Sequence, residues 1–166
     1  MPMLKNGDPF PTLSFVTEGG GTIALPDDVR GSYAVILIYR GAWCPLCNAQ
    51  LAGYEATKDA LDRLGAKVVA LSVDDEATTR ALRKKHGLSY PIGVAANADE
   101  IAGATGAFTN AMPRHLQPAS FILDPTGSVM TAVYSTHAVG RLVAADAVTF
   151  ISYMKAKAAA KQDSAA

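Results

Sequence analysis

The chain of 166 residues has little cysteine, no net charge and no long apolar run, and each shortage excludes a class of protein. Its two cysteines are too few for the disulfide framework of a small secreted domain. Lys and Arg total 15, as do Asp and Glu, so the formal net charge is zero and no basic face for nucleic acid or anionic lipid is indicated. We therefore expect a small molecule or another protein as the partner.

Apolar residues do not gather into one long segment. Nowhere do about 18 of them follow one another, so no transmembrane helix and no membrane partner is predicted. The opening MPMLKNGDPFPTL has no apolar stretch long enough for the core of a signal peptide. We therefore expect a soluble, cytoplasmic protein. In that reducing compartment a close cysteine pair is catalytic, redox-active or metal-binding more often than structural.

The first half of the chain alternates strand and helix patterns, which predicts an α/β fold. A short hairpin is expected around residues 19–21, in a segment rich in Gly, Pro and Thr. The apolar runs AVILIY (34–39) and KVVALSV (67–73) are typical of strands that are covered on both faces. Between them a helix is predicted from Pro45 to about Leu64, and DDEATTRALRKKHG predicts the next helix, because acidic residues open it and basic residues close it.

In the second half, the pattern predicts a hairpin and a last helix. ASFILD (119–124) and SVMTAVYS (128–135) flank a Pro-Thr-Gly turn, so we expect two antiparallel strands. The apolar residues between 143 and 154 fall on one face of a helix, and residues 156–166 are expected to fray into a tail. The stretch YPIGVAANADEIAGATGAF between these halves gives no clear pattern.

The two cysteines lie at the end of the first predicted strand, in the sequence RGAWCPLC. Functional groups of α/β sheets gather at such strand ends, where the following helix offers free N–H groups and partial positive charge. Pro45 suits the first helical position, so Cys44 is the predicted cap and Cys47 lies one turn into the helix. A thiolate is stabilised there, and the two sulfur atoms are close enough to form a disulfide.

Two other interpretations of the pair are weaker. A structural zinc site needs four ligands, and the three histidines, His86, His115 and His137, show no ligand spacing, so no metal is expected. Two inert core cysteines are less typical, because this pair follows Trp43 and encloses a proline at a strand end.

WCPLC at a strand-to-helix junction resembles the W-C-x-x-C motif of the thioredoxin-fold superfamily. The segment PASFILDPTGSV resembles the part of that superfamily in which a cis-proline faces the two cysteines, and the resemblance makes Pro118 that proline. It implies a thioredoxin-like fold, with a mixed central sheet flanked by helices and, in this chain, an N-terminal hairpin extension.

Longer segments resemble the peroxiredoxins of the alkyl hydroperoxide reductase and thiol-specific antioxidant family. These segments are GDPFPTLSF and VALSVDDEATTRALRKKHGLSYPIGVAANADEIAGATGAF. Laid on the family motif P-x-x-x-T-x-x-C, Cys47 takes the peroxidatic position and Cys44 the place of the threonine. Arg40 stands where the motif has proline, and Pro118 stands where these proteins usually have an arginine that helps bind peroxide. The pattern is closest to divergent peroxiredoxin-like proteins that carry a thioredoxin-type pair.

The resemblance covers about residues 6–155. We find no internal repeat and no linker long enough to separate two domains, so the whole chain, 1–166, is interpreted as a single thioredoxin-like domain.

Several residues near the motif have both a functional and a neutral interpretation. Arg40 is either a solvated residue or a charge that lowers a cysteine pKa, and Arg114 has the same ambiguity. The resemblance makes Trp43 a half-exposed contact surface for a partner protein. His115 and His137 lack a recognisable partner motif and are expected to be structural or surface histidines.

Three functions remain open. A thiol peroxidase would attack a hydroperoxide with Cys47 and condense the sulfenic acid with Cys44, giving an antioxidant enzyme with a redox-active disulfide. A disulfide oxidoreductase would attack a partner's disulfide with a more exposed Cys44, and Cys47 would resolve the mixed disulfide. A redox sensor would use the same pair with little turnover. We favour the peroxidase and keep the disulfide oxidoreductase as the alternative.

The expected partners follow from this chemistry. The substrate is a hydroperoxide or a disulfide, and an external dithiol such as thioredoxin restores the thiols. No bound cofactor is needed, because the reversible disulfide is itself the redox group. The resemblance is compatible with a homodimer.

Overall fold

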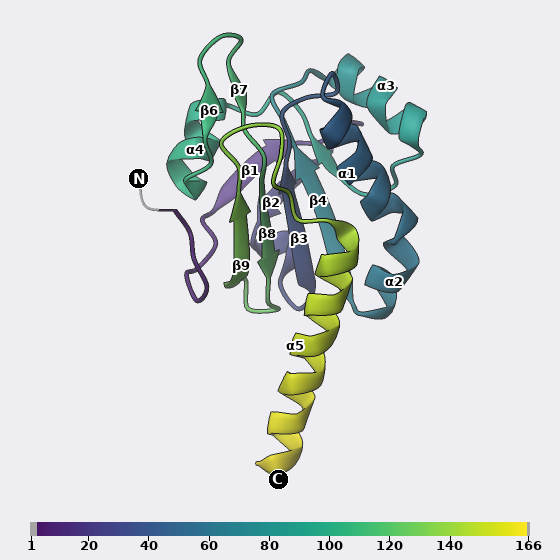
Figure 1. Ribbon diagram of the computed structural model, residues 1–166, viewed down its shortest axis with the longest axis vertical. Coiled ribbons are helices and arrows are strands. Elements are labelled where there is room, and N and C mark those ends of the chain that lie inside the picture. The colour runs from purple at the N-terminus through teal and green to yellow at the C-terminus, as the bar shows by residue number, and fades with distance from the viewer. Residues whose placement is uncertain (1–2, 166) are drawn as a thin grey trace.

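The computed structural model describes residues 3–165, which form a central sheet with helices and a hairpin around it (Figure 1). The strands are β1 (Leu13–Val16), β2 (Thr22–Leu25), β3 (Tyr33–Ile38), β4 (Ala66–Leu71), β5 (Ile92–Gly93), β6 (Thr109–Asn110), β7 (His115–Leu116), β8 (Ala119–Leu123) and β9 (Val129–Tyr134). The helices are α1 (Pro45–Ala56), α2 (Lys58–Arg63), α3 (Glu76–His86), α4 (Ala98–Thr105) and α5 (Ala144–Ser164), with a short 3-10 turn at Asp27–Val29.

The central sheet is mixed, as expected for a thioredoxin-like fold. Its order is β5-β4-β3-β8-β9, with β3 parallel to β4 and antiparallel to β8. The apolar run of β3 is fully buried in the middle of the sheet because each face is covered. Its alternate residues Val35 and Leu37 belong to the core that α1, α2, α3 and α5 complete. Ala34 and Ile36 belong to the core on the other face, which the N-terminal hairpin and α4 complete.

Both predicted hairpins are confirmed. β1 pairs with β2 in antiparallel register around the glycine-rich turn, and β8 pairs with β9 around Pro125–Gly127. The middle of the chain, which gave no clear pattern, forms β5, α4 and the small β6-β7 ladder. The second predicted helix is α3, which begins at the cap Asp75 and ends at Gly87 in the left-handed conformation.

The single helix predicted from Pro45 to Leu64 is wrong, because the structure divides it at Thr57. The Thr57 hydroxyl and amide both bond to the carbonyl of Gly53, and Thr57 ends α1. A threonine side chain that bonds one turn back competes with regular helix geometry. The division turns α2 slightly away from α1 while both remain on the same face of the sheet (Figure 1).

The expected frayed tail is also different in the structure. α5 continues to Ser164 and projects well past the lower edge of the sheet (Figure 1). Ala and Lys dominate this part, and both have high helix propensity, which explains a helix without tertiary support. Residue 166 lies outside the described residues. Within the described part, no helix combines the length and apolar character needed to cross a membrane.

Candidate active site

The cysteine segment, residues 39–48, connects β3 to the first turn of α1. Cys44 is the N-cap of α1 and its sulfur accepts a hydrogen bond from the amide of Cys47, at 3.3 Å. Pro45 occupies the start of the helix, where its missing N–H leaves no donor unsatisfied. The placement of Cys44 as cap and Cys47 one turn into the helix is therefore as the sequence predicts.

Both thiols are free and buried. Cys44 is 1% exposed and Cys47 is 0% exposed, so neither sulfur offers a surface to a protein-sized partner. The Cys47 thiol donates to the Cys44 sulfur, and the backbone N–H of Arg40 donates to the Cys47 sulfur at 3.4 Å. The expected difference in exposure is only 1%, so Cys44 is not the accessible sulfur that a disulfide oxidoreductase needs.

The hydrogen bond between the two thiols gives them different pKa values. Burial acts to raise the pKa of Cys44, but hydrogen bonds from the thiol and amide of Cys47, the charge of Arg141 and a hydrogen bond from Arg40 outweigh it and lower this pKa. Burial and the bond that its thiol gives to Cys44 raise the pKa of Cys47 to about 11. The pair therefore loses its first proton readily and its second with difficulty.

Arg40 and Trp43 form the outer edge of the site. The Arg40 guanidinium lies 4.6 Å from the centre of the Trp43 ring, a cation–π contact. Trp43 is 56% exposed and also packs edge-on against the ring of His115, with 5.2 Å between ring centres. His115 is buried and its Nδ1 donates to the carbonyl of Pro113, while burial lowers its pKa, so it is a neutral structural neighbour of the site.

Asp74, beyond the end of β4, fastens the cysteine segment to the sheet. Its carboxylate accepts the amide of Ala42 at 2.7 Å. Burial raises the pKa of Asp74, and the bonds from Ala42 and Ser72 act against that rise. Gly41 allows this close approach, because a Cβ there would collide with the Trp43 indole and lie 3.1 Å from Asp74 Oδ1.

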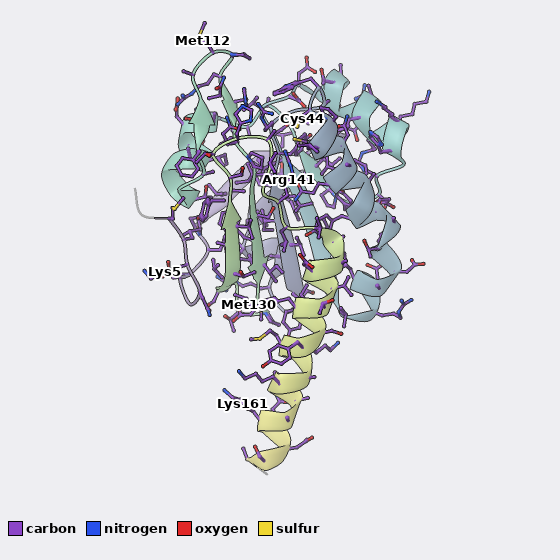
Figure 2. The ribbon with its side chains drawn as sticks, in the orientation of Figure 1. Lys5, Cys44, Met112, Met130, Arg141 and Lys161 are labelled. Atoms are coloured by element: carbon purple, nitrogen blue, oxygen red, sulfur yellow. The ribbon has the colours of Figure 1, made fainter. Side chains whose placement is uncertain are left out.

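Arg141 is the functional side chain that the sequence analysis missed. It belongs to the arginine segment, residues 135–143, which joins β9 to α5 and brings Arg141 next to Cys44 (Figure 2). Its Nη2 lies 3.0 Å from the Cys47 sulfur and 3.6 Å from the Cys44 sulfur. One arginine in an irregular segment, about a hundred residues from the cysteines, carries no local signal that could have revealed this contact.

Pro118 is not the cis-proline that the resemblance implies. In residues 3–165 the cis peptide bonds are Leu25-Pro26 and Met112-Pro113, so the bond before Pro118 is trans. The amide of Gln117 donates to Phe108, and the carbonyl of Pro118 accepts the amide of Ser135. These bonds connect the entry to β8 with the segments around Phe108 and Ser135.

The remaining candidates lie away from the sulfur atoms. Arg114 pairs with Asp99 on the exposed surface, and His137 is exposed. His86 lies at the end of α3. Across the described residues no group of three or more His, Cys, Asp or Glu side chains has the arrangement of a metal site.

An apolar groove of about 530 Å³ runs beside the pair, between α1 and the start of α5. Arg141, Gln50 and Thr57 are its polar lining residues, and Leu46, Gly53 and Val143 are among its apolar ones. Neither cysteine lines the groove, but Arg141, which does, also contacts both sulfur atoms.

Comparisons with known proteins agree with this geometry. The AhpC/TSA family matches residues 6–132. A peroxiredoxin of Treponema denticola is 29% identical over 145 residues, which cover 85% of this chain and 68% of that protein. A peroxiredoxin of Thermotoga petrophila is 27% identical, over 81% of this chain and 65% of its own length. The chain thus spans about two thirds of the length of these relatives.

Solved structures agree on the fold. Mycobacterium bovis AhpC superimposes with a TM-score of 0.81 at 20% identity, covering 95% of this chain and 96% of that one. Mycobacterium tuberculosis AhpC gives a TM-score of 0.79 at 19% identity, covering 94% and 96%.

Proposed function

Because the chain belongs to the AhpC/TSA family, and is a peroxiredoxin-like, thiol-dependent oxidoreductase, we propose that it reduces hydroperoxides through a reversible disulfide between Cys44 and Cys47. The observation that carries the proposal is the pair of free, hydrogen-bonded thiols at the N-terminus of α1, which are buried too deeply for a large substrate to touch either sulfur.

The reaction has two steps in the protein. The first step starts from the pair with Cys44 as the thiolate and Cys47 as the thiol. Cys47, in the peroxidatic position of the family, attacks the terminal oxygen of ROOH as its proton passes to the Cys44 thiolate. The O–O bond breaks, the oxygen stays on Cys47 as a sulfenic acid, and RO⁻ takes a proton from solvent. Cys44 then attacks the sulfenic sulfur, and the departing hydroxide combines with the Cys44 proton to give water. An external dithiol reduces the resulting disulfide and leaves both thiols restored.

The reductant and assembly follow the family. We propose a thioredoxin-type dithiol as the reductant, since peroxiredoxins use one, and a homodimer as the assembly to be tested. The cytoplasmic location stays a prediction.

Single substitutions test the proposal. Cys47→Ser is expected to abolish peroxide consumption, whereas Cys44→Ser is expected to form one sulfenic acid, trapped by dimedone, and then to stop. The assay follows hydrogen peroxide with a supplied dithiol, and the double variant gives the background. Peroxide reactivity that persists without Cys47 would contradict the assignment of the attacking sulfur.

The lowered pKa of Cys44 favours a second function, thiol–disulfide exchange, in which Cys44 attacks a disulfide. Under that function Cys47→Ser traps mixed disulfides through Cys44 and leaves peroxide untouched. The burial of Cys44 in the reduced protein weighs against it, because a partner's disulfide must reach this sulfur to begin the reaction, whereas the proposed reductant meets the oxidised protein.

A further inference from the structure

β4 is paired along only part of its outer edge. β5 is the last strand of the sheet on that side, and it pairs with just the final two residues of β4. Beside it, the amides of Ala70 and Ser72 donate outward to the carbonyls of Pro91 and Gly93. Residues 66–69 have β3 on their inner side, and within residues 3–165 no strand pairs with their outer side.

This unpaired edge presents four backbone groups. The direction of backbone hydrogen bonding alternates along a strand, so Ala66 and Val68 direct their N–H and C=O groups to the same side as Ala70. Across the described part of the chain, no other backbone group bonds to these four. Two donors and two acceptors in one line are the pattern that a further β-strand satisfies.

The edge lies in a groove of about 560 Å³, which residues 66–69 line together with side chains from both faces of the sheet. Ile23 and Val29, on the side of the N-terminal hairpin, form one wall. Leu61 of α2 and Tyr90 form the other wall. The side chains of an added strand would point alternately to the two walls, so successive apolar residues fit this groove.

The charged residues at the rim of the groove balance one another. Lys58 pairs with Asp62, and the amino group of Lys67 bonds to the backbone carbonyl of Asp28. Two lysines and two aspartates leave the rim without net charge. A charged side chain on the incoming strand would lose water against the apolar walls, at a cost in free energy. The segment that fits is therefore uncharged.

The shape of the groove selects a single extended segment. The edge is recessed between two walls, and the same edge of a second copy is recessed in the same way. Two such edges cannot approach to the spacing of about 4.8 Å that paired strands need. The exposed Lys67 side chain is a further obstacle to edge-to-edge pairing. Four unpaired residues, at a rise of about 3.3 Å each, accommodate a segment roughly 13 Å long.

We infer that the unpaired edge of β4 is a binding site for an extended, uncharged, apolar segment of a partner protein, which adds as a short strand in line with β5. The cysteines follow the carboxyl end of β3, whereas this edge is the amino end of the parallel β4. Cys44 lies at the upper end of the sheet in Figure 2, and α2 lies at the lower end in Figure 1. The bound segment does not contact the thiols, so the inference is independent of the proposed function.

The first experiment measures binding of a defined peptide by fluorescence anisotropy. The probe is Gly-Ser-Val-Ile-Val-Thr-Ser with a fluorescein label at its N-terminus and an amidated C-terminus, added to the reduced full chain. Saturable binding is expected. Three further peptides carry an N-methyl group on one of the central Val, Ile and Val residues. Affinity is expected to fall about tenfold at alternate positions, because alternate N–H groups of the added strand donate to β4.

Substitutions in the wall test the position of the site. Ile23→Lys places a charge among the apolar side chains and is expected to weaken binding roughly tenfold. Thr22→Lys is the matched control, because Thr22 is the exposed neighbour on β2 and does not line the groove. Circular dichroism and urea unfolding check that both variants fold.

Hydrogen exchange, followed by NMR on the unmodified chain, tests the backbone contacts. In the free protein the amides of Ala66 and Val68 are expected to exchange faster than that of Ala70, which already donates to Pro91. Saturating peptide is expected to slow Ala66 and Val68 at least tenfold and to leave Ala70 unchanged.

Three results would overturn the inference. The first is absence of binding at millimolar peptide. The second is equal affinity for the parent and all N-methylated peptides, with exchange at Ala66 and Val68 unchanged, which would indicate non-specific apolar contact. The third is protection of these two amides in the free protein together with a dimer in light scattering, which would assign the edge to a second copy of the chain.

Discussion

Two segments meet at the sulfur atoms, and different forces hold them there. The cysteine segment is anchored by apolar burial: Tyr39, Cys47 and the following Leu51 are all 0% exposed and share one core cluster. The arginine segment is mostly exposed, with Val139 at 75%, and is held by polar bonds of Ser135 and Arg141. The nucleophile is therefore placed as firmly as the core itself, whereas the cation that activates it depends on a few hydrogen bonds.

Leu51→Ala breaks the apolar anchor. We expect the free energy of unfolding to fall by about 2–5 kcal/mol, because a fully buried leucine leaves a cavity behind α1. Urea unfolding of the reduced protein measures it. Leu46→Ala is the control on the same helix, where the side chain is 44% exposed and a far smaller loss is expected. Equal losses for the two variants would show that α1 is not held by its buried face.

Ser135→Ala breaks the polar anchor. The buried Ser135 hydroxyl shares its one proton between the carbonyls of His137 and Val139 and accepts the amide of His137. Removing it is expected to cost about 1–2 kcal/mol of unfolding free energy and to raise the pH at which the cysteines are alkylated, because Arg141 is then less well oriented. The exposed neighbour offers the control Thr136→Ala. A loss of stability with an unchanged alkylation profile would separate this segment from the chemistry.

Gly53→Leu changes the groove beside the two segments and leaves the contacts that hold each segment in place. Gly53 lines the groove between them, and a Cβ there meets no atom within 4 Å, so a larger side chain fits and narrows the groove. We expect kcat/KM for cumene hydroperoxide to fall roughly fivefold and that for hydrogen peroxide to stay unchanged. Gly53→Ala adds a single methyl group and serves as the control. A parallel fall for both peroxides would mean that the groove is not the route for the organic group.

The difference between the cysteine segment and the arginine segment also explains which features the sequence could predict. The strand predicted at residues 34–39, which the structure places at Tyr33–Ile38, the cap at Cys44 and the paired thiols follow from apolar runs and a local motif, in which every interacting residue is near in the chain. Arg141 and Gln50 meet across 91 positions, and no periodicity encodes such a contact. The trans bond before Pro118 and the break at Thr57 depend on individual hydrogen bonds, which a pattern of residue types does not specify.

The sulfur of Cys44 is also a structural part of α1, since it accepts the first-turn amide of Cys47. Oxidation changes that acceptor from a thiolate or thiol into half of a disulfide, so the reduced and oxidised proteins have different caps. A thermodynamic cycle then ties the reduction potential to folding: each 1.4 kcal/mol by which one redox form of the folded chain is stabilised over the other moves the potential by about 30 mV. A substitution anywhere along α1 that favours one cap geometry is therefore expected to change the reduction potential of the cysteine pair.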